Sequence, residues 1–167
     1  MNPAFVLHQT FFGAIAAAGF GVLFNVAPRR LAWCAASGAL ALAIRTVCQG
    51  LGLSLVGASF TAALIVGIGA HLRWGRTDTS KDVLGVVGCI PMVPGSLASK
   101  ALLALFAITN GSVANDSQTL FQAAQYTLLV MFTIAAIGTG LVIPLLVVRS
   151  GAGGDDREFS RPSGPTP

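Results

Sequence analysis

Apolar residues occur in long continuous runs along this chain, separated by short stretches rich in glycine, proline or charged residues. Each run has about the 20 residues that a helix needs to cross a bilayer. The pattern predicts an all-α membrane protein with five transmembrane helices, at about residues 3–24, 31–49, 53–72, 83–108 and 120–148. These spans form a transmembrane domain over residues 1–149. Residues 150–167 are rich in Gly, Pro, Ser and Asp and are predicted to form a disordered tail, because they cannot bury apolar surface.

The fourth run is interrupted near its middle by the segment IPMVPGS, residues 90–96. Pro91 and Pro94 lack a backbone donor and clash with the preceding turn, and Gly95 adds backbone freedom at the same point. We therefore expect a broken span whose second helix begins near Ser96. Such an opening at membrane depth is tolerated only when it is buried in protein or lines a cavity. Transporters place anionic substrates at half-helix N-termini of this kind.

Composition supports a membrane protein: 54% of the 167 residues are hydrophobic, 10% are charged and the mean hydropathy is +0.77. Soluble domains carry about 25% charged residues. The net charge of +4 does not indicate nucleic-acid binding, because the basic residues lie mainly at the ends of the apolar runs. The three cysteines lie inside apolar runs without metal-ligand spacing, so we expect small buried side chains and no cofactor.

The basic residues outside the spans predict the orientation in the membrane. In a five-span topology all of them fall on one side, and the other side has none. By the positive-inside rule this places the N-terminus in the periplasm and the C-terminus in the cytoplasm. The residues are Arg29, Arg30, Arg73, Arg76, Lys81, Arg149, Arg157 and Arg161.

Two basic residues, Arg45 and Lys100, lie within spans, both in the outer half of the membrane. They could converge on an anionic substrate, or Arg45 could instead extend to the outer interface. Ser96, Ser99 and Lys100 share one side of the second half-helix, although Ser96 could only cap it and Ser99 could bond back to the backbone. The candidate substrate-binding residues are Arg45, Pro91, Pro94, Gly95, Ser96, Ser99 and Lys100.

No catalytic set is visible, because the six acidic residues lie in loops or the tail. The sequence predicts no enzyme, and an acidic proton carrier for transport would have to come from another subunit. Gly13, Ala17 and Gly21 repeat at a spacing of four in the first span. This small-residue ridge predicts close approach of another helix.

The run FNVAPRRLAWCAASG, residues 24–38, resembles the signature of YjjB proteins, the small subunits of the threonine/serine exporter (ThrE) family. The segment IPMVPG resembles the family's interrupted span, and Arg45 stands where the family pattern carries an arginine. The resemblance covers roughly residues 10 to 148. It implies a bacterial inner-membrane subunit that works with a larger YjjP-like membrane subunit. Such pairs are associated with succinate export, and fused relatives with threonine and serine export.

Together, the residue pattern and the resemblance predict a subunit of a secondary exporter for small carboxylates, with succinate as the first candidate substrate and threonine or serine as the second. A non-transporting structural subunit that stabilises its membrane partner is the alternative from another class. Small-residue faces on the first and third spans fit that alternative equally well.

Overall fold

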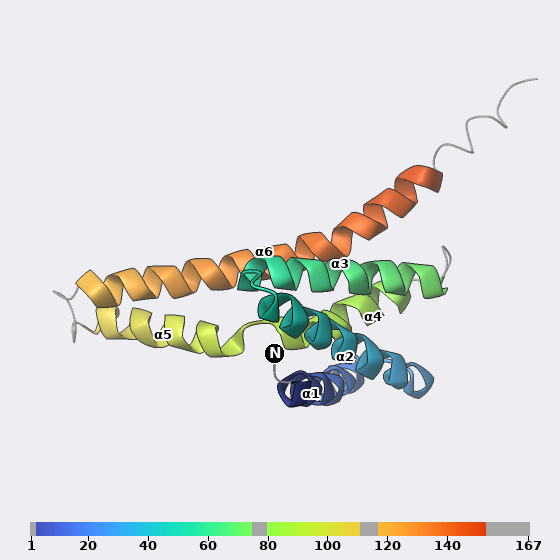
Figure 1. The fold of residues 1–167 in the computed structure, drawn as a ribbon, viewed down its shortest axis with the longest axis horizontal. Coiled ribbons are helices and arrows are strands. Elements are labelled where there is room, and N and C mark those ends of the chain that lie inside the picture. Colours follow the sequence, from blue (N-terminus) through green and yellow to red (C-terminus); the bar gives the residue numbers. More distant parts are fainter. Residues whose placement is uncertain (1–2, 75–79, 111–116, 153–167) are drawn as a thin grey trace, which may run out of the picture.

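The computed structural model describes residues 3–74, 80–110 and 117–152. These residues are almost entirely helical and contain no strand, so the predicted all-α membrane protein is confirmed (Figure 1). The elements are α1 (Pro3–Leu23), α2 (Pro28–Gly50), α3 (Leu55–Trp74), α4 (Ser80–Cys89), the short 3₁₀ helix η1 (Ile90–Met92), α5 (Gly95–Thr109) and α6 (Ser117–Ala152).

Three of these helices, namely α1, α2 and the part of α6 from Ser117 to Pro144, are long and apolar enough to cross a membrane. A fourth candidate span is the bent pair Gly85–Met92 and Gly95–Thr109. The predicted third span corresponds to α3, Leu55–Trp74, of which the segment Leu55–Ala70 is identified as apolar. The prediction that this helix also crosses the membrane, which would give five transmembrane helices, is therefore not tested by the structure.

Helices α1 and α2 each end in a backbone turn of the same type. Asn25 and Gly52 adopt positive φ angles of 55° and 92°. In the first turn Val26 N–H bonds Gly21 C=O at 2.9 Å and Asn25 N–H bonds Val22 C=O at 3.0 Å. This pattern is a Schellman motif, in which Asn or Gly tolerates the left-handed residue. Pro28 then starts α2, three residues before the predicted start, because its ring fits the first helical position.

Small residues bring the helices into close contact. Gly13, Ala17 and Gly21 are the buried residues of α1, and they face α2, as the ridge predicted. A Cβ added to Gly38 of α2 would lie 2.3 Å from the Ala17 Cβ. Similarly, a Cβ on Gly140 of α6 would lie 2.9 Å from the Ala63 Cβ on α3. The small-residue faces of α1 and α3 are therefore used within the chain.

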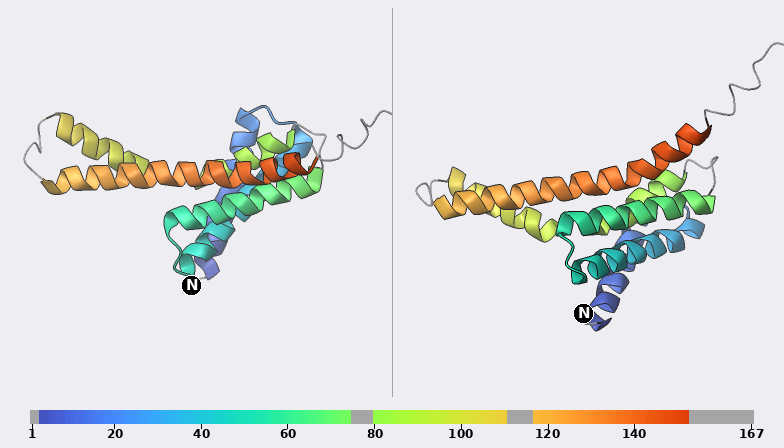
Figure 2. Two further views of the ribbon diagram at one scale, coloured as in Figure 1. Left: turned by 90° about the horizontal axis from the view of Figure 1, so that it is seen from above. Right: turned by 45° about the horizontal axis from the view of Figure 1, so that its top comes forward.

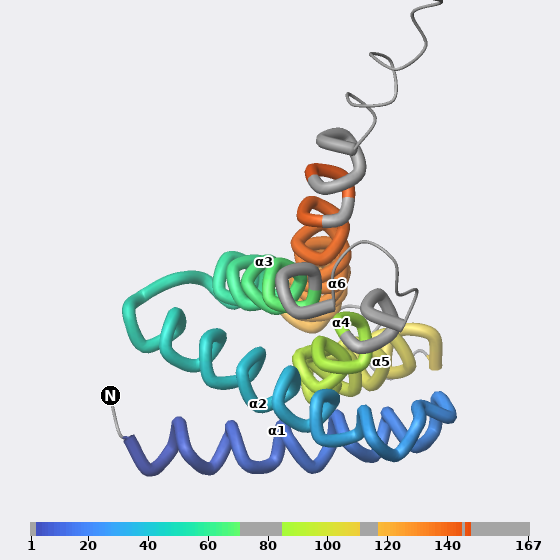
Figure 3. Tube along the Cα trace, turned by 90° about the vertical axis from the view of Figure 1, so that its right-hand side faces the viewer, coloured from blue at the N-terminus to red at the C-terminus, as the bar shows by residue number. Residues whose placement is uncertain are grey.

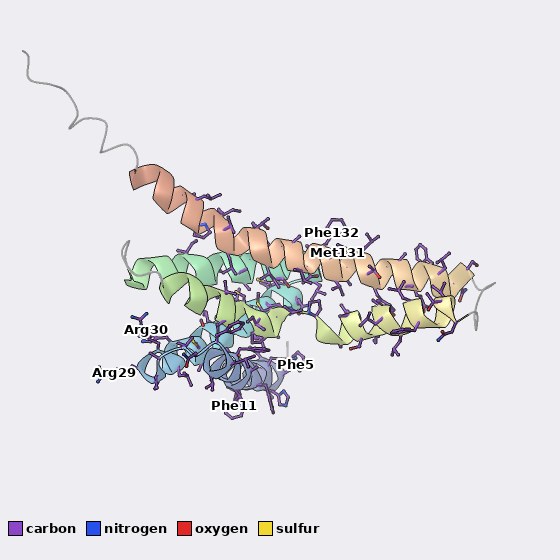
Figure 4. The ribbon with its side chains drawn as sticks, turned by 180° about the vertical axis from the view of Figure 1, so that it is seen from behind. Phe5, Phe11, Arg29, Arg30, Met131 and Phe132 are labelled. Carbon is purple, nitrogen blue, oxygen red and sulfur yellow. The ribbon has the colours of Figure 1, made fainter. Side chains whose placement is uncertain are left out.

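Helices α3, α4 and the C-terminal half of α6 lie side by side, whereas α1 runs across their direction (Figures 1 and 3). The α1–α2 turn, the end of α3, the start of α4 and the end of α6 all lie at one end of the molecule (Figures 1 and 2). Arg29 and Arg30 mark this end in Figure 4. This grouping matches the predicted topology, in which these connections share one side of the membrane.

Apolar side chains cover the outside of the molecule. Phe5 and Phe11 point outward from α1, and Met131 and Phe132 point outward from α6 (Figure 4). The buried core is small by comparison and combines residues from α2, α3, α4, η1 and α6, namely Ala41, Ala62, Ala63, Val66, Cys89, Met92 and Ile137. An apolar exterior around a core of small residues is the pattern expected of a protein that contacts lipid.

Helix α6 is longer than predicted and continues to Ala152, three residues into the predicted tail. It contains Pro144, and it turns away from α3 toward its C-terminal end (Figure 1). A proline inside a helix is a usual cause of such a bend. The rest of the predicted tail, residues 153–167, lies outside the described residues.

Candidate functional site

The interruption of the fourth span is present at the predicted residues. Helix α4 passes into η1 at Ile90, Val93 is extended with φ −60° and ψ 126°, and Pro94 precedes the first residue of α5. The axes on the two sides of the break differ by 54°. Pro91 and Pro94 explain the break, because neither residue can donate the hydrogen bond that a continuous helix needs.

The break separates backbone groups that a continuous helix would have paired, among them the Ser96 N–H and the Met92 carbonyl. In such a helix the Ser96 N–H would donate to the Met92 carbonyl, four residues earlier. Here the neighbouring amides bond locally: Gly95 N–H donates to Val93 C=O at 2.8 Å, and Leu97 N–H donates to Pro94 C=O at 3.1 Å. The Ser96 amide has no hydrogen-bond partner among the described residues.

Arg45 of α2 supplies the missing donor for the Met92 carbonyl. Its Nη1 atom hydrogen-bonds that oxygen across 47 positions of sequence. Cys34, Gly38 and Ala41 are the buried residues of α2, and Arg45 continues their line at spacings of four, three and four. The guanidinium therefore turns toward the break, and its part in substrate binding stays a prediction.

The energy that Arg45 costs in the membrane and the energy that its hydrogen bond returns are similar in size. An arginine costs about 2.5–3.5 kcal/mol at the centre of a span on insertion scales, and less in the outer half, where Arg45 is predicted to lie. A hydrogen bond to a charged group returns about 1.5–3 kcal/mol. The guanidinium has five N–H donors, and among the described residues its recorded hydrogen-bond partner is the Met92 carbonyl alone. Its other donors have no recorded partner among the described residues, and Arg is the side chain that binds carboxylates in a bidentate way.

The other predicted residues divide between the two sides of the break. Pro94 is buried and Pro91 is half-buried, whereas Gly95 and Ser96 are exposed. No atom lies within 4 Å of a Cβ added to Gly95. Ser96 does not cap α5, because the helix begins one residue earlier and the position before it makes no side-chain cap. The break therefore presents an open glycine and serine next to a buried, arginine-held interior.

Ser99 and Lys100 lie further along α5 and are exposed. The Ser99 hydroxyl donates to the Gly95 carbonyl at 3.0 Å. This is the bond back to the backbone that was predicted as the alternative to substrate binding. The Lys100 ammonium lies 6.0 Å from the centre of the Tyr126 ring on α6. The structure thus brings Arg45 to the break. It places Lys100 further along α5, on the same side of that helix as Ser96 and Ser99.

The sequence interpretation missed Met92. Its side chain is fully buried in the core, and its carbonyl anchors Arg45. The spacing of Arg45 from the small residues of α2 was a usable signal that it faces the protein interior. Among the described residues, no group of three His, Cys, Asp or Glu side chains could hold a metal ion. A shallow polar hollow of about 440 Å³ lies at the start of α6, lined by Ser117, Gln118, Phe121, Gln122 and Gln125.

These features define a multi-pass helical membrane protein with one interrupted span and a basic side chain at the interruption. The profile of the threonine/serine exporter family, ThrE, matches residues 9–147. The chain belongs to this family, which is a family of transporters and not of enzymes.

A relative from Haemophilus influenzae, described as an uncharacterized protein, is 33% identical over 144 residues. The match covers 85% of this chain but only 47% of the relative, so the chain spans about half of that protein's length. No solved structure matches the chain.

Proposed function

We propose that this chain is the small subunit of a secondary exporter for small carboxylates, with succinate as the first candidate substrate, and that it acts with a YjjP-like membrane subunit. The single observation that carries the proposal is the Arg45 guanidinium, which lies at the break and bonds the Met92 carbonyl there. A passing carboxylate would bind these donors and the exposed N-terminus of α5 around Ser96.

The relative from Haemophilus influenzae supports a second component of the exporter. That protein carries about as much chain again outside the segment that this chain matches. We propose that a YjjP-like component supplies the corresponding part of the pathway. The exposed side of the break, at Gly95 and Ser96, would then face the path between the two components.

Threonine and serine are the second candidate substrates, and the family description favours them. Charge favours succinate. Threonine and serine carry an ammonium group, and the described parts of this chain with placed side chains, residues 3–70, 85–110 and 117–147, contain no Asp or Glu to pair with it. A dicarboxylate needs only positive charge and amide donors, which the break offers.

Export of labelled succinate, threonine and serine from cells that express this chain with the YjjP-like subunit tests the proposal. We expect succinate export to require both components. Gly95→Leu should lower export, because it fills the open side of the break without meeting a neighbour within the chain. Gly19→Leu is the matched control, since Gly19 is also exposed with no atom within 4 Å of an added Cβ.

Three outcomes would contradict the proposal in different ways. Normal export by Gly95→Leu at normal protein levels would remove the break from the pathway. Export of threonine and serine without succinate would reverse the order of substrates. Full export by the YjjP-like subunit alone would make this chain a structural subunit, although the small-residue faces that suggested this role are buried within the chain.

A further inference from the structure

Helix α5 and residues 117–131 of α6 form a hairpin, called here the arm, that projects beyond the rest of the molecule (Figures 1 and 2). Among the described helices, α6 is the one against which α5 packs extensively. Most of the α5 surface therefore has no neighbour among the described residues. Leu102 and Phe106, exposed by 56% and 62%, are side chains that suit a lipid environment.

One side of α5 does not suit lipid. Ser96, Ser99 and Lys100 are exposed there, at spacings of three and four residues. The Ser99 hydroxyl donates its hydrogen bond to the Gly95 carbonyl, so this exposed side chain needs no partner from outside the chain. Lys100 is different, because an ammonium group five residues into α5 and nine before its end lies well inside the bent span.

The described residues offer Lys100 little compensation. Among them, its one recorded contact is with the Tyr126 ring, at 6.0 Å from the ring centre. That separation is at the outer limit of a cation–π interaction, which returns only part of the cost of an ammonium group in hydrocarbon. No Asp or Glu occurs in residues 3–70, 85–110 or 117–147. No counter-charge for Lys100 is therefore present among the side chains that the structure places.

We infer that the Lys100 side of the arm is the docking surface for a transmembrane helix of the partner subunit that carries a carboxylate facing Lys100. The inference rests on the proposed two-component exporter and names the contact between its components. A substrate carboxylate is a weaker explanation, because it leaves in every transport cycle and Lys100 would then be unpaired for part of it. A lipid phosphate would be reached only if the Lys100 side chain extends toward the membrane surface, and the test below includes added anionic lipid for that reason.

Co-purification of this chain with a tagged, co-expressed YjjP-like subunit tests the contact without measuring transport. We expect Lys100→Glu to reduce the recovered complex about tenfold or more, because like charges would face each other inside the membrane. Lys100→Gln should reduce it less, and Lys100→Arg should retain it. Arg29→Glu, which makes the same charge reversal at an exposed residue outside the arm, should co-purify like the wild type. Substituting Lys for the facing acidic residue of the partner should restore the complex with Lys100→Glu.

Immunoblots of the membrane fraction show whether each variant is inserted, and Lys100→Gln provides the comparison if Lys100→Glu is not. Wild-type recovery with Lys100→Glu or Lys100→Gln would overturn the inference. Under that result, lost succinate export would assign Lys100 to the substrate, and recovery that varies with added anionic lipid would assign it to a headgroup. Failure of the wild-type pair to co-purify would also overturn it. A stable pair that exports no carboxylate would refute the proposed function and leave the docking surface standing.

Discussion

Arg45 is a residue whose presence stability alone does not explain. Its transfer into a span costs at most about 2.5–3.5 kcal/mol, the figure for the centre of the membrane, and its hydrogen bond to the Met92 carbonyl returns a similar amount, about 1.5–3 kcal/mol. Removing both the charge and the bond should therefore nearly cancel. A charged side chain that contributes so little net stability is most simply explained by the anion that its remaining donors can bind.

This balance predicts the behaviour of Arg45→Met, which keeps much of the side-chain volume. We expect its unfolding free energy in detergent to stay within about 1–2 kcal/mol of the wild type, by the difference between the same two energies. Succinate export should fall about tenfold or more, since losing a charge-assisted hydrogen bond costs at least about 1.5 kcal/mol. Thermal unfolding and export assays on one preparation check both. A destabilised variant with normal export would instead make Arg45 a structural residue.

At the residue scale the sequence identified the participants but not their contacts. Arg45 and the residues from Pro91 to Ser96 follow from rules on charge and proline within spans. The Met92 carbonyl could not be found in this way, because any backbone carbonyl near the break was an equal candidate. The choice depends on how α2 packs against α4 and η1, and this packing depends on close contacts such as that between Gly88 and Ser37.

At the scale of elements, the break between α4 and α5 is the feature that local chemistry determines most directly. Pro91 and Pro94 remove donors, and the observed interruption lies at these residues. The ends of α1 and α2 were less predictable. The predicted spans place Asn25 and Gly52 in connections between helices. Their Schellman turns depend on positive φ angles, which a pattern of apolar residues does not predict.

If the two prolines cause the break, replacing both with alanine should straighten it. Spin labels at Val86 and Leu102, which are exposed by 50% and 56%, lie on the two sides of the bend. We expect the distance between these labels to increase in the Pro91→Ala, Pro94→Ala variant, measured after Cys34, Cys48 and Cys89 are replaced. Export should be lost at the same time. An unchanged distance would mean that packing around Met92 and Arg45 holds the bend without the prolines.

At the scale of the whole molecule, the apolar pattern gives the number of runs but not their arrangement. It does not report that α1 lies across the other helices or that the arm projects beyond them (Figures 1 and 3). These features depend on the small-residue contacts of α1 with α2 and of α3 with α6, whose partners cannot be chosen from one sequence. The charge pattern was more informative, because connections predicted to share one side do lie at one end.

The side of the membrane that this end faces stays a prediction. The positive-inside rule places it in the cytoplasm together with the C-terminus. We therefore expect a C-terminal green fluorescent protein fusion to fluoresce and a C-terminal alkaline phosphatase fusion to be inactive. The same reporters placed before α1 should give the opposite result. An active C-terminal phosphatase would reverse the orientation and would change the direction in which the break opens.

The central claim is that the open side of the break meets water and substrate, and thiol labelling of Ser96→Cys tests it most directly. Cys34 and Cys89 are buried, so replacing Cys48 gives a low background. With the partner present, a small water-soluble thiol reagent should label Cys at position 96, and succinate should slow the labelling. Phe132→Cys, which points outward from α6 (Figure 4), is the lipid-facing control and should stay unlabelled. Labelling at position 96 no faster than at position 132, or unaffected by succinate, threonine and serine, would contradict the account.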